Sequence, residues 1–453
     1  MKKSDLLEQG IFENIKGIPA IDVHTHIDLS HLCARGLHDI ILYHMAVSDL
    51  YSAGMQDGSR LPEEPTEEEA YYRIKQALPY LKYTKNTSSS WGIRMILSDL
   101  YGFDEDVTAE NWKKADSLIK KHSTKPGRAD YIAKKSSVRK ISTELWRGHG
   151  KQNDMFYYSL EWAFFTRTQW GQFDTALLEL EYAWQQDVPG APLPVNIDRA
   201  RIKIKRRIKT LDDVEKAIEH YCDKIPYGKV VSTAQHISTD IRYRLVTDDE
   251  MARALAKRNT AGIKERDIYA NYILEKFLSK LERHCHEIIY QFSIGAEPLP
   301  FETQSKLTPE TISGLAEILS RHPGLKFQVF LSSEHQNQAM CTLARELPNL
   351  SLAGYWWHNF FPGIIRKIIR DRIDMLPVNK QIAFFSDAYC MEWMYAKSMI
   401  VRKQLASVLA EKICQGQFSE NIALEIAGEI MSNKPVLLGN SKMPLTTSST
   451  TLT

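Results

Sequence analysis

Eight short β-rich apolar runs, most of them separated by amphipathic helical segments, constrain the fold of this 453-residue chain more than any other feature. Alternating strands and helices predict parallel strands, and eight such units predict an α/β fold, a closed (β/α)8 TIM barrel. The runs are Ala20–His24, Val138–Ser142, Leu193–Ile197, Lys229–Thr233, Ile288–Ile294, Lys326–Leu331, Leu350–Tyr355 and Gln381–Ser386. An open doubly wound sheet is the alternative, but the glycine-rich phosphate-binding motifs of its nucleotide-binding versions are missing.

The interval between the first two runs is too long for a simple crossover, and its pattern is mostly helical. We therefore expect residues 1–30 to hold the N-terminus and first barrel strand, and residues 31–132 to form a helical insertion covering the active-site face. The side chains of His44 and Trp91 are expected to point from this insertion toward the active site. Residues 133–438 are expected to complete the barrel, and the polar low-complexity residues 439–453 to form a disordered tail.

Composition and charge exclude several classes of protein. The net charge of +2 does not predict an extended nucleic-acid surface, and no apolar segment has the length of a membrane span. Six cysteines without a Cys-x-x-Cys pair, and an N-terminus without an apolar signal segment, indicate a cytoplasmic protein. We expect a small-molecule substrate as the partner, and a homo-oligomer is compatible with the sequence.

The tripeptide His24-Thr25-His26 closes the first predicted strand, where side chains two residues apart project from one face. Two imidazoles in this arrangement suit a divalent ion if a carboxylate completes the set. Asp387 closes the eighth predicted strand, which barrel closure brings beside the first. The alternatives are a pair of ordinary surface or capping histidines and an aspartate that caps the final helix.

These landmarks and several others in the same order resemble the uronate isomerases of the amidohydrolase superfamily, over nearly the whole stretch from Ile18 to Asn440. The shared markers are Ile21-Asp-Val-His-Thr-His26, Tyr43-His44 followed by Ala53-Gly54, Gly354-Tyr-Trp-Trp357, Ser386-Asp387-Ala388 and Ala396-Lys397-Ser398. The resemblance implies a metal-dependent aldose–ketose isomerase acting on a hexuronate, such as glucuronate or galacturonate, or on a related acid sugar.

The resemblance also implies roles for individual residues. His24, His26 and Asp387 would bind one divalent ion, with zinc as the first choice and manganese as the alternative. Asp387 would move a proton between C2 and C1 of the sugar, and His44 would help to hold charge on a substrate oxygen.

Two positions depart from the family pattern at substrate contacts. The family's usual His-Tyr pair reads His44-Met45 in this chain. Its usual Ser/Thr-Asp-x-Arg motif ends in Tyr389 instead of arginine, and we expect Tyr389 to contact the substrate. An arginine binds a carboxylate through two parallel hydrogen bonds, which a tyrosine cannot reproduce, so another arginine is expected to substitute. The candidates are Arg94, Arg147 and Arg242.

Other strand ends supply further candidate substrate contacts. Ser293 stands where many family members have a histidine, and His236, at the end of the fourth predicted strand, is its candidate replacement. Of Trp356 and Trp357, one is expected to stack on the sugar and the other to pack in the core. Two other functions stay open: a metal-dependent hydrolase in which Asp387 shuttles the proton of an activated water, and a catalytically silent relative.

Overall fold

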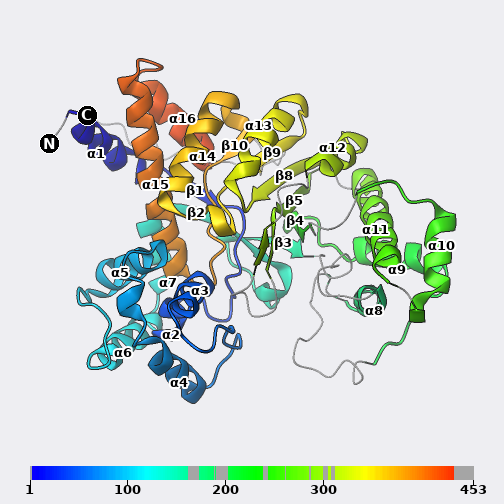
Figure 1. Ribbon diagram of the computed structural model, residues 1–453, viewed down its shortest axis with the longest axis horizontal. Coiled ribbons are helices and arrows are strands. Elements are labelled where there is room, and N and C mark those ends of the chain that lie inside the picture. The colour runs from blue at the N-terminus through cyan, green and yellow to red at the C-terminus, as the bar shows by residue number, and fades with distance from the viewer. Residues whose placement is uncertain are drawn as a thin grey trace.

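A curled sheet of eight parallel strands forms the centre of the molecule (Figure 1). The strands, in order across the sheet, are β1 (Ala20–Asp22), β2 (Val138–Glu144), β3 (Phe156–Glu161), β4 (Val230–His236), β5 (Ile289–Ile294), β8 (Lys326–Leu331), β9 (Leu350–Ala353) and β10 (Gln381–Ile382). A separate antiparallel pair is formed by β6 (Ala296–Pro298) and β7 (Ser305–Leu307). The arrangement confirms the predicted TIM-barrel-like α/β fold.

The computed structural model describes residues 3–161, 173–187, 189, 203–237, 243–260, 262–284, 287–298, 305–307 and 312–432. The predicted tail, residues 439–453, lies outside this part of the chain. The predicted strand Leu193–Ile197 and the candidate Arg242 also lie outside it.

The third strand of the sheet is β3, and the prediction that Leu193–Ile197 takes this place is wrong. β3 fills the position between β2 and β4, with Phe156 paired to Ile141 and Leu160 paired to Thr233. Its sequence, Phe-Tyr-Tyr-Ser-Leu-Glu, has the aromatic composition that favours a strand. The expected number of barrel strands, eight, is confirmed, because β3 takes the place of the misassigned run in the parallel sheet.

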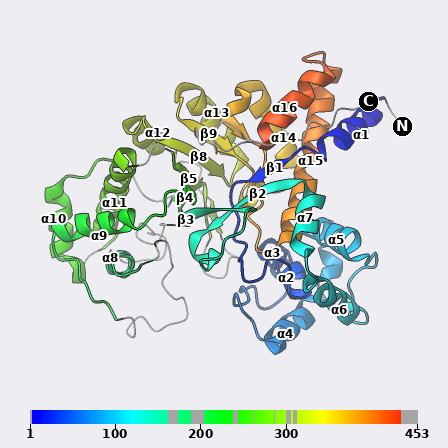
Figure 2. The ribbon, with the colours of Figure 1, turned by 180° about the vertical axis from the view of Figure 1, so that it is seen from behind.

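The helices surround the sheet and extend beyond one end of it (Figures 1 and 2). Those that precede β1 or follow β3 are α1 (Lys3–Ile15), α8 (Phe173–Ala183), α9 (Leu211–Asp223), α10 (Asp248–Ala256), α11 (Ile263–His284), α12 (Ile312–Arg321), α13 (Asn337–Glu346), α14 (Pro362–Met375), α15 (Met391–Cys414) and α16 (Glu420–Ser432). Helix α9 begins where Thr210 and Asp213 form a capping box. Among the described residues, no helix has both the length and the apolar character needed to cross a membrane.

The long interval between β1 and β2 is helical. It contains α2 (His38–Ile41), α3 (His44–Ser52), α4 (Glu67–Ala77), α5 (Ser88–Tyr101), α6 (Trp112–Ser123) and α7 (Arg128–Ser136). In both ribbon views α2 to α6 gather beneath the sheet. Helix α7 packs against β2 and α15, and α5 also packs against α15, so the long helix α15 joins this group to the barrel.

The first and last strands meet through hydrogen bonds just beyond their ends. The Asp387 amide donates to the His24 carbonyl at 3.0 Å, and the His26 amide donates to the Ala388 carbonyl at 2.8 Å. The buried Asp22 carboxylate accepts the amide of Ser386 at 2.9 Å. The barrel is therefore closed at this seam, and the closure places the two predicted strand-end motifs side by side.

Helix α15 is fixed by a fully buried arginine. Arg402 donates to the carbonyl of Ile15 at 2.6 Å and to the hydroxyl of Ser398 at 3.1 Å, and it lies 3.4 Å from the carbonyl of Ser136. These contacts tie α15 to the ends of α1 and α7, which lead directly into β1 and β2. The start of α15, just after Asp387, is thereby fixed relative to the first strand.

Replacing Arg402 with leucine should lower the free energy of unfolding by about 1–3 kcal/mol, because buried carbonyl groups would lose their donors. The loss is measured by urea denaturation. The matched control is Lys403→Leu, since Lys403 is exposed and lies over the face of the Phe12 ring, an interaction worth about 0.5–1 kcal/mol. Equal stability losses in the two variants would contradict the role given to Arg402.

Candidate metal centre

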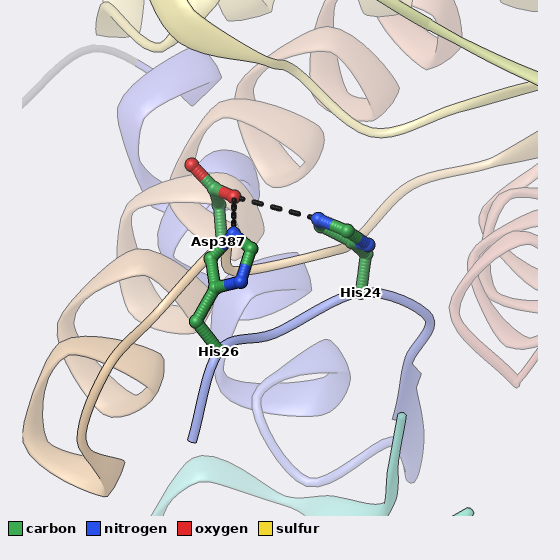
Figure 3. A group of neighbouring side chains, drawn as sticks. All are labelled: His24, His26 and Asp387. Atoms are coloured by element: carbon green, nitrogen blue, oxygen red, sulfur yellow. Dashed lines mark ion pairs between the residues drawn. The ribbon is translucent and has the colours of Figure 1, made fainter. Parts of the chain in front are cut away.

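His24, His26 and Asp387 come together where β1 and β10 end (Figure 3). One ligand atom from each lies within 4.8 Å of those of the other two. Asp387 Oδ1 is 3.2 Å from Nε2 of His26 and 3.7 Å from Nε2 of His24. The strand itself ends at Asp22, so the two histidines lie just past it and still project toward the same oxygen.

A second carboxylate orients His26 from behind. Nδ1 of His26 contacts Oε1 of Glu144, at the end of β2, so Nε2 is the nitrogen turned toward Asp387. Metal-binding histidines characteristically use their other nitrogen in this way, which fixes the tautomer and the direction of the ring. The site predictions did not include this role of Glu144, although its position at the end of the second predicted strand put it on the same edge of the sheet.

The donor groups of the cluster suit a bound cation, provided that His26 gives up a proton to it. Burial lowers the pKa of His24 to about 4, which leaves its imidazole neutral, the form that binds metals. Burial would also disfavour a charged His26 and a charged Asp387. The Glu144 carboxylate nevertheless raises the pKa of His26 well above its ordinary value, so an ion bound at His26 would displace a proton from the ring. The hydrogen bond from His26 holds the pKa of Asp387 well below its own. Two imidazoles and a carboxylate form a donor set that suits zinc and similar divalent ions.

Asp387 is held in an unusual backbone conformation. Its φ of 53° lies in the left-handed region, which non-glycine residues seldom adopt outside sites that constrain them. The Tyr43 hydroxyl donates to its carbonyl at 2.8 Å, and the buried Lys397 ammonium donates to that hydroxyl at 2.7 Å. These contacts from the insertion and from α15 hold the backbone of Asp387 in this conformation.

His44 lies at the start of α3 and faces the other oxygen of Asp387. Its Nε2 is 3.7 Å from Oδ2, and neither ring nitrogen has a hydrogen-bond partner among the described residues. Burial lowers the pKa of His44 well below its usual value, so the ring is neutral. A buried imidazole with both nitrogens available is suited to contact a ligand oxygen.

Aromatic rings continue from His44 along the rim of the barrel. Trp357 stacks on His44 with ring centroids 5.5 Å apart, Trp356 lies next to Trp357, and His236 lies 5.4 Å from Trp356. Trp356 belongs to the buried core, whereas Trp357 is only partly buried. Ser293, on β5, pairs in register with His236 and is buried.

The candidate arginines do not all reach this region. Arg147, in the turn after β2, lines a cavity of about 100 Å³ with His26, His44 and Tyr389. Arg94, on α5, instead donates to the carbonyl of Lys85 and lines a different cavity. Trp91, also on α5, packs partly buried against the core and does not line the His26 cavity.

A further arginine that the sequence predictions missed also lines this cavity. Arg60, between α3 and α4, lies 4.4 Å from the centroid of the Tyr389 ring, and that ring stacks on His26 at 4.8 Å. Nothing in the local sequence around Arg60 marks it, since only the fold brings its segment to Tyr389. Tyr389 therefore lies between a candidate metal ligand and a guanidinium group.

Replacing Glu144 with glutamine should weaken zinc binding by about 10–100-fold, because His26 would lose the carboxylate that orients and polarises it. Zinc affinity is measured by competition with a chromophoric chelator. The control is Glu346→Gln, at an exposed position on α13, which should leave the affinity unchanged. Unchanged zinc affinity in the Glu144 variant would show that this carboxylate does not support the site.

No family model matches the sequence, and no curated protein matches it either. Solved structures do resemble the fold. A uronate isomerase from Thermotoga maritima aligns with a TM-score of 0.75 and 13% identity, over 95% of this chain and 97% of the other. A glucuronate isomerase from Caulobacter crescentus gives a TM-score of 0.74 and 15% identity, over 95% and 93%.

A candidate metal-dependent hydrolase from Lactobacillus casei also aligns, with a TM-score of 0.52 and 13% identity, over 93% of this chain and 95% of the other. At these identities the likeness is one of fold, and the chemistry must be argued from the site. The chain therefore shares the fold of the uronate isomerase structures along nearly its whole length, in agreement with the resemblance of its motifs.

Proposed function

We propose that this protein is a metal-dependent aldose–ketose isomerase acting on an acid sugar of the hexuronate type. The observation that carries the proposal is the grouping of His24, His26 and Asp387 at the barrel seam, with His44 on the opposite side of the same carboxylate. The fold shared with uronate isomerases supports the assignment to this reaction class, and the motif resemblance supports the choice of substrate.

His24, His26 and Asp387 would hold one divalent ion, zinc by preference and manganese as the alternative. When bound, the ion polarises substrate oxygens and stabilises negative charge that develops on them. The two carboxylate oxygens of Asp387 face different groups, so one can help to hold the ion while the other acts as a base. Oδ1 faces the histidines, and Oδ2 faces His44, so Oδ2 is the oxygen available as a base.

The proton transfers balance within the sugar and the chain. Asp387 takes the proton from C2 and returns it to C1, while the C2 hydroxyl loses its proton and the C1 oxygen gains one. His44 is neutral, and its ring nitrogens have no hydrogen-bond partner among the described residues, so it is placed to hold the substrate oxygen that carries charge between these steps. No external oxidant or reductant is needed, because C1 is reduced as C2 is oxidised.

Substrate contacts would come from the cavity and the aromatic rim. Arg147 and Tyr389 line the cavity beside His26. Trp357 offers a partly exposed ring next to His44, suited to the apolar face of a sugar, whereas Trp356 serves mainly as core packing. His236 and Ser293 stand farther along the same rim and are candidate contacts for substrate hydroxyls.

A metal-dependent hydrolase is the second candidate function. The same donor set would suit an ion that activates water, with Asp387 taking its proton, and the fold is shared with a candidate hydrolase. A lactone and amide panel separates the two reactions. Hydrolysis of the panel without conversion of any hexuronate would favour the hydrolase, and a chain inactive toward both would favour the catalytically silent relative.

Incubation with glucuronate or galacturonate in deuterated water should produce the corresponding ketose, which NMR detects. Asp387→Asn should abolish turnover, because an amide cannot accept the C2 proton, while the circular dichroism spectrum remains unchanged. Asp212→Asn, at an exposed position on α9, is the control and should retain full activity. Turnover retained by the Asp387 variant would remove this residue as the base.

Removing the metal should abolish activity and lower the melting temperature, and added zinc or manganese should restore both. At a metal concentration 100 times the Kd, binding contributes about 2.7 kcal/mol to stability. The double variant His24→Asn, His26→Asn should lose this stabilisation, which differential scanning calorimetry measures. A wild-type protein with no affinity for zinc or manganese would overturn the common mechanism.

A further inference from the structure

The Arg147 guanidinium already binds a carboxylate on the cavity side. Its two terminal nitrogens lie 2.6 and 3.2 Å from the two oxygens of Glu63, in the paired geometry that arginine uses for carboxylates. Arg147 is buried, whereas the Glu63 side chain is 52% exposed. The mobile partner of this ion pair is therefore the glutamate.

The inner edge of the same guanidinium points toward the metal centre. Nε of Arg147 forms an ion pair with Oε2 of Glu144 at 2.8 Å, and Oε1 of Glu144 contacts His26. Glu144 thus fixes Arg147 at a set position relative to a candidate metal ligand. The two terminal nitrogens of Arg147, which bond to Glu63, are the part of the side chain that a ligand in the cavity can reach.

Glu63 can leave without unfolding its segment. The backbone carbonyl of Glu63 accepts from Arg35 at 2.6 Å, and Arg35 is itself paired with Asp39 at 2.9 Å. These contacts hold the main chain in place. Rotation of the Glu63 side chain into solvent is therefore enough to release the two terminal nitrogens of Arg147. Exposed glutamates rotate readily because little packing restrains them.

The cavity is smaller than a typical small-molecule pocket, and removal of the Glu63 side chain from its wall would enlarge it. Its volume is about 100 Å³, whereas pockets for small molecules usually measure about 300–1,000 Å³. The cavity wall on this side consists of residues from one segment, Arg60, Leu61, Pro62, Glu63 and Pro65. With Glu63 in place, the carboxylate of an anionic sugar would be the third one around Arg147, beside those of Glu144 and Glu63, which is electrostatically unfavourable.

We propose that Glu63 is an internal carboxylate that occupies, in the substrate-free chain, the position on Arg147 that the carboxylate of an acid sugar takes. The sugar displaces Glu63, opens the cavity and leaves Arg147 neutralised by one inner and one bound carboxylate. Arg60, stacked on Tyr389 at the same wall, adds positive charge at the entrance. The inference rests on the proposed function for the choice of an acid sugar as ligand.

The test measures binding, not turnover, by isothermal titration of zinc-loaded protein with glucuronate, galacturonate and the neutral sugar glucose. Glu63→Gln should tighten glucuronate binding by about three- to tenfold, the effect of removing a competing ion pair of this exposure. Binding of glucose should not change. Glu64→Gln, the neighbouring exposed glutamate, is the matched control and should leave both affinities as in the wild type.

A double-mutant cycle with Arg147→Lys identifies the site of competition, because lysine keeps the charge but lacks the paired fork. The gain from Glu63→Gln should disappear in the Arg147→Lys background. Unchanged or weaker glucuronate binding by Glu63→Gln overturns the proposal, as does an equal gain for glucose or no detectable binding of either uronate to both proteins.

The binding test and the turnover test can fail independently of each other. Tighter binding of glucuronate but not glucose, without any ketose formation, would support the proposed role of Glu63 and contradict the isomerase activity. Ketose formation by the wild type, without tighter glucuronate binding by Glu63→Gln, would support the isomerase activity and contradict the proposed role of Glu63.

Discussion

The seam between β1 and β10 is the constraint on which the rest of the site depends. Amide–carbonyl hydrogen bonds join Asp387 to His24 and His26 to Ala388, and Asp22 accepts the amide of Ser386. Segments more than 350 residues apart in sequence are thereby held within hydrogen-bonding distance. Because the same backbone groups carry the three candidate ligands, the geometry of the metal centre and the closure of the barrel are one structural feature.

A continuous set of ionic contacts extends outward from this seam. Asp387 faces His26, His26 contacts Glu144, Glu144 pairs with Arg147, and Arg147 pairs with Glu63 at the surface. Charges alternate in sign along this path, so each buried group has an opposite neighbour that offsets its desolvation. The candidate metal site lies at the inner end of this path. The Glu63 carboxylate, which we propose is displaced by the substrate, lies at its outer end.

Part of the fold was predictable because it depends on local pattern. Apolar β-rich runs predict strands wherever side chains must be buried on both faces, and β5 and β8, which are buried along nearly their whole length, follow that rule. The third strand was misassigned because Leu193–Ile197 and Phe156–Glu161 both have strand-like composition. Only pairing with β2 and β4 distinguishes the strand that belongs to the sheet, and pairing is a property of the assembled fold.

The sequence by itself determined the chemical identity of the candidate centre: two histidines on alternate positions after one strand and an aspartate after another, all at the edge where parallel strands end. The tertiary structure alone decided their neighbours. Glu144 contacts His26, Tyr43 and Lys397 hold the backbone of Asp387, and Arg60 lies over Tyr389. Tyr43 and Lys397 belong to motifs that the sequence already marked, but their contacts with Asp387 appear only in the fold, and nothing in the local sequence marks Arg60. Spacing along a strand is fixed by backbone geometry, whereas contacts between distant segments depend on how the whole chain packs.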